Sequence, residues 1–493
     1  MPSPRPAKMR IAIIGSGFSG VGMAIRLKRL GYTSFTIYEA SCDLGGTWRD
    51  NTYPGAACDV PSHLYSFSFE ANPAWSRAFS HQHEILAYLK HCARKYQVES
   101  AIRFDARVKA ARFDEARLVW LLDIARNGVH ETVEADAVIS AVGQFSRPAM
   151  PQIDGIETFS GTIFHSARWN HDYPLEGKRV AVIGTGASAI QFIPQIQPHV
   201  ARLSLFQRTA PWIMPKRDQP VGERARWLFT HLPFTQRCVR SAIYWQMESH
   251  GLGFFVNPKL VNPSMKFARS YLERRVKDPA LRAKLTPDYR LGCKRVLLSS
   301  DYYPALCQPN VDVVTAPIRT IVHDGIVTAD GMHHAVDAII CGTGFQVNDV
   351  GTPFDITGIG GADLSALWLR DGPEAYLGTS IAGFPNFFMI VGPNTILGHN
   401  SMIYMIESQL QYIAECLREL QRRGVRTMNL RADVQRAFNE ELQRDMQRTV
   451  WTSGCHSWYQ TKRGKITAIW PRFTFSFRRR TRRVRSGEYL YSR

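Results

Sequence analysis

The sequence has no long hydrophobic run, no closely paired cysteines and no surplus of acidic residues. No stretch of about eighteen or more apolar residues occurs, which argues against a membrane-spanning helix. The nine cysteines show no CxxC pair and no regular spacing, so we expect neither a metal site nor disulfides. The opening MPSPRPAKMR lacks the apolar core of an export signal. We therefore expect a soluble protein of the reducing cytoplasm.

Acidic residues are outnumbered, since 61 lysines and arginines against 42 aspartates and glutamates give a net charge of +19. A basic balance of this size is compatible with binding to nucleic acid or to an anionic membrane. We interpret it chiefly as a solvated basic surface and expect no nucleic-acid partner. Weak peripheral contact with anionic lipid through a basic C-terminal run is the second option. That run consists of Arg478, Arg479, Arg480, Arg482, Arg483 and Arg485.

Near the N-terminus the sequence contains a strand-like run, a glycine turn and a helical pattern in direct succession. Residues 10–14 (RIAII) lead into Gly15-Ser16-Gly17-Phe18-Ser19-Gly20. In a dinucleotide-binding unit the first glycine makes the turn, the second admits the pyrophosphate and the third packs the helix on the strand. Glu39 follows the next strand, where a carboxylate binds ribose hydroxyls and repels a 2′-phosphate. The first site is therefore predicted to bind FAD or NAD rather than NADP.

A second unit of the same kind begins at residues 179–183 (RVAVI) and continues through Gly184-Thr185-Gly186-Ala187-Ser188 into a helical pattern. Two such units predict two dinucleotides. The strand that follows ends in Arg208 and Thr209 instead of an acid. Because a guanidinium binds phosphate through two hydrogen bonds, the second cofactor is predicted to be NADPH.

Between the two units, residues 45–59 form a loop with a double glycine and a Tyr-Pro-Gly corner, typical of a segment that covers a large flat ligand. Its fixed positions match the fingerprint (A/G)GxWxxxx(F/Y)P(G/M)xxxD, so the chain resembles the Baeyer–Villiger monooxygenases. Residues 159–170 are similar to the second fingerprint of that family, FxGxxxHxxxW, with Asn170 where Pro or Asp is usual. The first fingerprint is carried by Gly45, Gly46, Trp48, Tyr53, Pro54, Gly55 and Asp59.

The resemblance implies an α/β fold with two Rossmann-like dinucleotide-binding domains, one for FAD and one for NADP, and a helical insertion in the NADP domain. The order along the chain assigns FAD to the first site. We expect a first FAD-binding segment at residues 1–147 and an NADP-binding domain at 148–344 with the insertion at about 212–290. A second FAD-binding segment, with a C-terminal pocket cover, is expected at 345–493.

The resemblance also implies the chemistry. NADPH reduces FAD, dioxygen adds at flavin carbon 4a, and the peroxyflavin inserts one oxygen atom next to a ketone carbonyl to give an ester or lactone. Arg295 is expected to stabilise the peroxide, Asp59 to orient Arg295, and His165 to act as a hinge. No metal is expected. The residues expected to bind the cofactors are Gly15, Gly17, Phe18, Ser19, Gly20, Glu39, Gly46, Thr47, Trp48, Asp59, Tyr65, Gly184, Thr185, Gly186, Ala187, Ser188, Arg208, Thr209, Lys294 and Arg295.

Three alternative functions compete with this interpretation. A flavin monooxygenase that oxidises amine nitrogen or sulfide sulfur shares the FxGxxxH part, and Asn170 is the point in its favour. A two-dinucleotide disulfide reductase needs a CxxxxC pair, but Cys42 and Cys58 lie too far apart. A non-enzymatic basic protein that binds nucleic acid or lipid leaves both glycine loops unexplained. A ketone and dioxygen are therefore the expected substrates.

Overall fold

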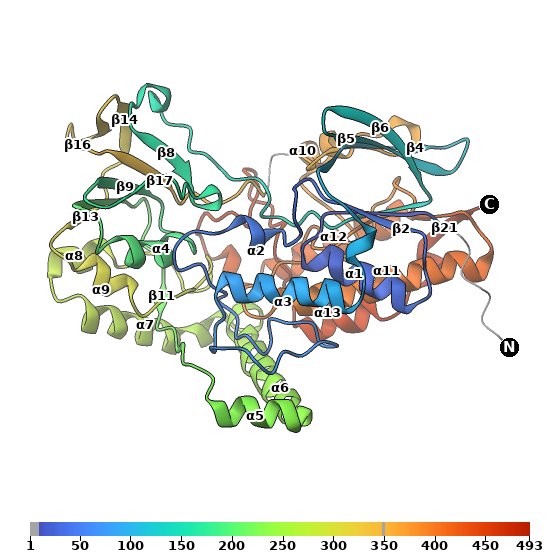
Figure 1. The fold of residues 1–493 in the computed structure, drawn as a ribbon, viewed down its shortest axis with the longest axis horizontal. Coiled ribbons are helices and arrows are strands. Elements are labelled where there is room, and N and C mark those ends of the chain that lie inside the picture. The colour runs from blue at the N-terminus through green and yellow to red at the C-terminus, as the bar shows by residue number, and fades with distance from the viewer. Residues whose placement is uncertain (1–8, 348–350) are drawn as a thin grey trace.

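The chain forms two lobes that lie side by side, each built on a five-stranded parallel sheet (Figure 1). The computed structural model describes residues 9–347 and 351–493. Residues 1–8, which include most of the opening segment considered for an export signal, lie outside that part. The predicted α/β class is confirmed, with several parallel sheets in one chain.

The first lobe is organised around a sheet whose strands are buried on both faces. Apolar runs such as IAII form strands of this kind, because a parallel sheet is covered on both sides. Although most of the sheet comes from the N-terminal third of the chain, its last edge strand comes from the C-terminal part. In spatial order the strands are β19 (Phe387–Met389), β7 (Ala137–Ser140), β1 (Ile11–Ile14), β2 (Phe35–Tyr38) and β3 (Ile102–Arg103).

Helices cover one face of this sheet, and a second sheet covers the other. The helical side holds a core cluster shared by α1 (Phe18–Arg29), α3 (Gln82–Lys95) and α11 (Met402–Arg423). An antiparallel sheet packs on the opposite face. Its strands are β4 (Ala106–Asp114), β5 (Val119–Arg126) and β6 (Val129–Ala135), joined in parallel by β18 (Asp355–Thr357).

The second lobe repeats the plan with its own parallel sheet, which also has a core cluster on each face. The helix α4 (Ala189–Ile196) follows the second glycine loop and packs on one face. A three-stranded antiparallel sheet lies against the other, formed by β14 (Ile318–Val322), β15 (Gly325–Thr328) and β16 (His333–Ala335). In spatial order the parallel strands are β13 (Val311–Val314), β10 (Arg202–Phe206), β9 (Arg179–Ile183), β17 (Ala338–Cys341) and β8 (Thr162–His165).

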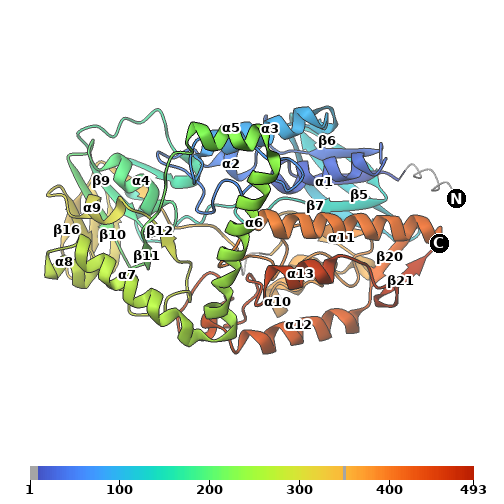
Figure 2. The same cartoon turned by 90° about the horizontal axis from the view of Figure 1, so that it is seen from below.

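Helices fill the stretch between two short paired strands, β11 (Ile213–Met214) and β12 (Leu297–Leu298). The pair α5–α6 projects below the body of the molecule in Figure 1 and crosses the face shown in Figure 2. The helices of this stretch are α5 (Glu223–His231), α6 (Pro233–Ser249), α7 (Asn262–Arg275) and α8 (Pro279–Lys284), with a π-helical turn η4 (Leu252–Val256) and a 3₁₀ turn η5 (Pro258–Val261) between α6 and α7.

The C-terminal part closes the first lobe. Helix α11 begins where the Ser401 hydroxyl accepts a hydrogen bond from the Ile403 amide and ends at Gly424, which adopts a left-handed conformation. In the described part of the chain, no helix combines the length and the apolarity needed to cross a bilayer. The remaining α-helices and strands are α2 (Thr47–Asp50), α9 (Tyr302–Leu306), α10 (Leu364–Asp371), α12 (Ala432–Met446), α13 (Thr474–Thr481), β20 (Thr427–Leu430) and β21 (Tyr489–Ser492).

Candidate active site

The first glycine loop joins β1 to α1 and has the shape that its sequence predicts. Gly15 has φ +101°, and a Cβ on Gly20 would lie 1.9 Å from the Gly15 carbonyl oxygen, so only glycine fits at position 20. Beside Gly17, in contrast, the nearest atom to an added Cβ is the Gly46 Cα at 3.7 Å. Helix α1 has no side-chain cap, which leaves backbone N–H groups free to bind phosphate. The loop therefore fits a pyrophosphate.

Glu39 lies at the end of β2, is 5% exposed and is held from two sides. The amide and hydroxyl of Ser16 donate hydrogen bonds to its Oε2 at 2.9 and 2.6 Å, and the Arg49 guanidinium lies 2.9 Å from its Oε1. Buried carboxylates need such partners. The sequence pattern identified Glu39 but missed Ser16 and Arg49, although both lie within the motifs, at their variable positions.

A cluster of three aromatic side chains lies beside the first glycine loop. The Trp48 indole N–H donates to the Tyr65 hydroxyl at 3.1 Å, and the Phe18 ring meets the Tyr65 ring edge-on at 5.5 Å between centroids. Burial raises the pKa of Tyr65 well above its usual range, so its hydroxyl stays protonated. Thr47 and Trp48 begin α2 directly after Gly46. The structure thus brings the predicted residues Phe18, Gly46, Thr47, Trp48 and Tyr65 together.

The second glycine loop repeats the geometry of the first. Gly184 has φ +107°, and an added Cβ would lie 2.5 Å from the Gly342 carbonyl oxygen. At Gly186 the nearest atom to an added Cβ is 3.8 Å away, which leaves room for a ligand. Helix α4 begins after Ser188 and also has no side-chain cap. The Thr185 hydroxyl donates to the Thr209 carbonyl at 3.1 Å, so the loop is fixed to the end of β10.

Two cations flank this second loop. Arg208 is exposed just after β10, and Lys294 belongs to the segment that precedes β12. Burial lowers the pKa of Lys294, and the positive charge of Arg208 lowers it further. Like charges held close together favour an anion between them. This arrangement, with Ala187 and Ser188 at the start of α4, fits a phosphate-bearing cofactor.

Arg295 and Asp59 meet between the two units although they are 236 residues apart. The Arg295 Nε and Nη2 atoms lie 2.8 and 2.5 Å from Asp59 Oδ2, and its Nη1 lies 3.4 Å from the Leu397 carbonyl. The negative charge of Asp59 raises the pKa of Arg295 above its ordinary value, so the guanidinium stays protonated. The two side chains keep 30% and 27% of their surfaces exposed, so they remain accessible to a ligand.

Tyr459 in the C-terminal part is 1% exposed, and its pKa responds to the charges of both Arg295 and Asp59. Burial raises the pKa of Tyr459 to about 12, and the positive charge of Arg295 opposes the rise. Nothing in the sequence pattern singled out Tyr459, because only tertiary packing relates it to Arg295.

Gln191 on α4 fixes the Gly45–Asp59 loop to the second lobe. It exchanges hydrogen bonds with the backbone of Ala57, accepting at 3.3 Å and donating at 3.0 Å, and it accepts from the Tyr53 hydroxyl at 2.9 Å. An added Cβ on Gly55 would lie 2.8 Å from the Gln191 carbonyl oxygen. The fingerprint glycine therefore allows the two lobes to approach, and nothing in the sequence pattern singled out Gln191.

His165 ends β8, is 3% exposed and contacts the segment that leaves the second lobe. Its Nδ1 accepts a hydrogen bond from the Ala167 amide at 3.1 Å, and its ring lies 5.9 Å from that of Phe345. Burial lowers the pKa of His165, so the ring is neutral at neutral pH. This position suits the expected hinge role, which stays a prediction.

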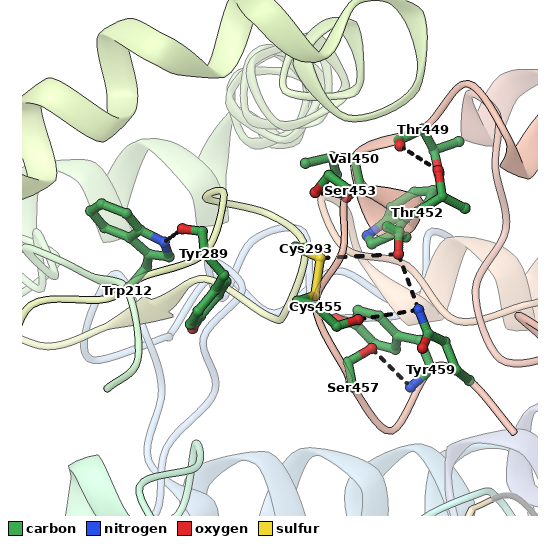
Figure 3. Close-up of a disulfide and its surroundings, with 12 residues drawn as sticks. Trp212, Tyr289, Cys293, Thr449, Val450, Thr452, Ser453, Cys455, Ser457 and Tyr459 are labelled. Atoms are coloured by element: carbon green, nitrogen blue, oxygen red, sulfur yellow. Dashed lines mark hydrogen bonds between the residues drawn. A yellow bond between two sulfur atoms is a disulfide. The ribbon is translucent and has the colours of Figure 1, made fainter. Parts of the chain in front are cut away.

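The expectation that the cysteines form no disulfide is wrong. Cys293 and Cys455 are bonded across 162 residues (Figure 3). Both are buried, and Cys293 directly precedes Lys294 and Arg295. The bond therefore links the segment that carries the two cations to the C-terminal segment that carries Tyr459. Scattered spacing concealed the pair, since sequence alone does not give connectivity.

Replacing Cys455 by serine is expected to lower stability by about 2–4 kcal/mol under oxidising conditions, because the disulfide closes a long loop. Thermal unfolding of wild type, Cys455→Ser and the control Cys307→Ser should be compared with and without dithiothreitol. Reduction should lower the melting temperatures of the wild type and of the control, whereas the melting temperature of Cys455→Ser should not change. A wild-type melting temperature that reduction leaves unaltered would contradict a structural disulfide.

The sequence and fold match known proteins over nearly the whole chain. The chain matches the Flavin-binding monooxygenase-like family over residues 8–231. It is 48% identical to a Baeyer-Villiger monooxygenase of Pseudomonas aeruginosa, covering 99% of this chain and 92% of the relative. A Baeyer-Villiger monooxygenase of Streptomyces coelicolor is 49% identical, and the match covers 98% of this chain and 92% of the length of that relative.

Solved structures agree with the sequence relatives. A closed cyclohexanone monooxygenase superposes with a TM-score of 0.88 at 26% identity, covering 98% of this chain and 99% of its own. A steroid monooxygenase bound to NADP gives 0.86 at 29% identity, over 99% and 100% of the two chains. An OTEMO complex with FAD and NADP gives 0.86 at 28% identity with the same coverage. The chain belongs to the Baeyer–Villiger monooxygenases.

Proposed function

We propose that the protein is an NADPH- and FAD-dependent monooxygenase that inserts one oxygen atom of dioxygen next to a ketone carbonyl to give an ester or lactone. Family membership supports the reaction class. The observation that carries the assignment to particular residues is the Arg295–Asp59 pair, which lies where the two glycine-loop units meet. The related structures with bound FAD and NADP support the cofactors.

Each cofactor is assigned to one glycine loop. FAD would be held by the first unit, where Gly17 leaves space for phosphate and Glu39 suits the ribose. NADPH would be held by the second, with Gly186 beside the phosphates and Arg208 and Lys294 at the 2′-phosphate. Under this assignment residues 1–147 and 345–493 form the FAD-binding domain, and residues 148–344 form the NADP-binding domain with the insertion at about 212–290.

When bound and reduced by NADPH, FAD supplies the activation of dioxygen. The guanidinium of Arg295 stays protonated and would lie beside the site where dioxygen is activated. It would stabilise the negative charge that develops on oxygen there. Asp59 would hold the guanidinium in that position through the two contacts to its Oδ2. Tyr459 and the disulfide-linked segment would help to exclude water, which protects a reactive intermediate from side reactions.

The alternative is a flavin monooxygenase that oxidises amine nitrogen or sulfide sulfur. Asn170 is the residue in its favour. The Asp59 contact with Arg295 favours ketone oxidation, because a fixed cation keeps the oxidant anionic, whereas nitrogen and sulfur oxidation need an electrophilic, protonated oxidant.

A substrate panel separates these two functions. The holoenzyme should be supplied with NADPH and equal concentrations of a cyclic ketone, an aryl ketone, a sulfide and a tertiary amine, and the products should be quantified together. Esters or lactones are expected as the main products. Sulfoxide or N-oxide formed with no ester from either ketone would favour the alternative.

The cellular location and the membrane contact of the C-terminal run stay predictions. Three of the six arginines in that run already have partners within the protein. Arg480 pairs with Glu441, Arg478 lies over the Tyr404 ring, and Arg485 pairs with Glu488. These contacts reduce the charge that the run can offer to a lipid surface.

A further inference from the structure

Exposed apolar side chains gather on the helices between residues 227 and 267. Of the eighteen large apolar residues exposed in the described part of the chain, nine lie in this short stretch. Trp227, Phe234 and Trp245 are 58%, 60% and 57% exposed. Clusters of this kind mark interaction sites more often than scattered single residues do. We call this surface the insertion face; its apolar members are Trp227, Leu228, Leu232, Phe234, Trp245, Leu252, Val256, Leu260 and Phe267.

Helix α6, at the centre of the insertion face, carries apolar side chains on both its packed side and its exposed side. Ile243, Tyr244 and Met247 pack against the core of the first lobe. The buried residues of the helix are Gln236 and Glu248. Gln236 donates to the Asn72 carbonyl at 2.6 Å, and Glu248 accepts from the Asn400 side chain at 2.6 Å. Its exposed side carries Phe234 and Trp245. Because the packed side already supplies apolar contacts to the core, the exposed Phe234 and Trp245 are available to a partner outside the described chain.

Basic side chains predominate on the helices of the insertion face, whose exposed acidic residues are Glu223 at the start of α5 and Glu273 near the end of α7. Between residues 224 and 272 the sequence has a single acidic residue, Glu248, and that residue is buried. None of the ion pairs among the described residues involves the basic side chains that surround the apolar members. Those side chains are Arg224, Arg226, Arg237, Lys259, Lys266 and Arg269.

Helix α13 extends the surface on one side of α6, as Figure 2 shows. The Tyr244 hydroxyl lies 3.0 Å from that of Thr474, and the Trp245 and Phe475 rings are 6.2 Å apart. Phe475 is itself 43% exposed. The apolar and basic character of the insertion face therefore continues onto a neighbouring element.

We propose that the insertion face docks on the surface of an anionic lipid bilayer. Interfacial attachment needs aromatic and aliphatic side chains that enter the headgroup boundary together with cations that meet the lipid charge, and this surface carries both. Two copies of the face would bring two predominantly basic surfaces together, so charge opposes self-association. The projecting position of α5–α6 leaves room for a flat partner (Figure 1). The contact is peripheral and does not depend on the proposed reaction.

The test is sedimentation of the FAD-loaded enzyme with vesicles of phosphatidylcholine alone and of phosphatidylcholine with phosphatidylglycerol. Binding to the anionic vesicles is expected, and it should weaken as salt is added. The combined substitution Trp227→Ser, Phe234→Ser and Trp245→Ser should reduce partitioning at least about tenfold. The combined charge reversal Arg224→Glu, Arg237→Glu and Lys266→Glu should do the same.

Two matched controls keep the test specific. The substitution Val129→Ser, Met332→Ser and Leu490→Ser changes exposed apolar residues elsewhere and should leave binding unchanged. Arg482→Glu with Arg483→Glu tests the C-terminal run and should reduce binding by less than the insertion-face variants. Flavin content and ketone oxidation without vesicles should be the same in all variants, which shows that they are folded.

Several outcomes would overturn the proposal. Failure of the wild type to bind anionic vesicles would do so, as would equal binding to phosphatidylcholine alone. Binding that only the Arg482→Glu, Arg483→Glu variant loses would move the contact to the C-terminal run. A dimer in sedimentation velocity that the tryptophan and phenylalanine substitutions dissociate, without vesicle binding by the wild type, would identify a second copy as the occupant.

Discussion

Replacing Arg295 by alanine is expected to slow ester formation about a hundred- to a thousandfold while NADPH oxidation continues. The guanidinium lies between the two units and is fixed by Asp59 through Nε and Nη2. Alanine removes the positive charge but leaves both glycine loops intact, so both cofactors should still bind. Parallel measurement of NADPH, ester and hydrogen peroxide should show peroxide replacing ester.

The pair Arg202–Asp312 provides the matched control, because it joins the same kinds of side chain on the second sheet, away from Arg295. Arg202→Ala should leave the ratio of ester to NADPH unchanged. Arg295→Lys keeps a positive charge but loses the planar fork, and its ester yield should fall between wild type and alanine. An ester yield from Arg295→Ala equal to that of wild type would refute the assigned role.

Replacing Arg208 by alanine is expected to lower kcat/KM for NADPH about ten- to a hundredfold and to leave kcat/KM for NADH nearly unchanged. Arg208 stands at the end of β10, close enough to Lys294 to lower its pKa. A 2′-phosphate would be held by both cations, whereas NADH has no such group. The loss should therefore appear as a change in cofactor preference.

The assay is the initial rate of flavin reduction without oxygen, measured over a range of NADPH and NADH concentrations. Arg202→Ala again serves as the control, since Arg202 begins the strand that ends just before Arg208. An unchanged ratio of the two kcat/KM values in Arg208→Ala would remove the phosphate assignment. Equal losses with both cofactors would indicate damage to the fold of the loop instead.

Local sequence was enough to predict the features that depend on backbone shape. The glycine loops were recognisable because Gly20 and Gly184 stand where a side chain would collide with backbone atoms. Glu39 was found because a fixed number of residues separates it from the loop. The α/β class followed from the alternation of apolar runs with helical patterns. These signals act over a few tens of residues.

The contacts that assemble the site are not local, and the sequence did not reveal them. Gln191 meets the Gly45–Asp59 loop across 134 residues, and Cys293 finds Cys455 across 162. Such partners have no spacing rule, because the fold of the whole chain brings them together. The Asp59–Arg295 contact was anticipated through the family resemblance, since no periodicity links the two positions.

The central claim is that this chain transfers an oxygen atom from dioxygen into a ketone. The most direct measurement is mass spectrometry of the product formed by the holoenzyme with NADPH, a cyclic ketone and isotopically labelled dioxygen. The expected product is a lactone that carries a single labelled oxygen atom, formed in proportion to the NADPH consumed. Labelled hydrogen peroxide or water with no labelled lactone, for every ketone supplied, would contradict it.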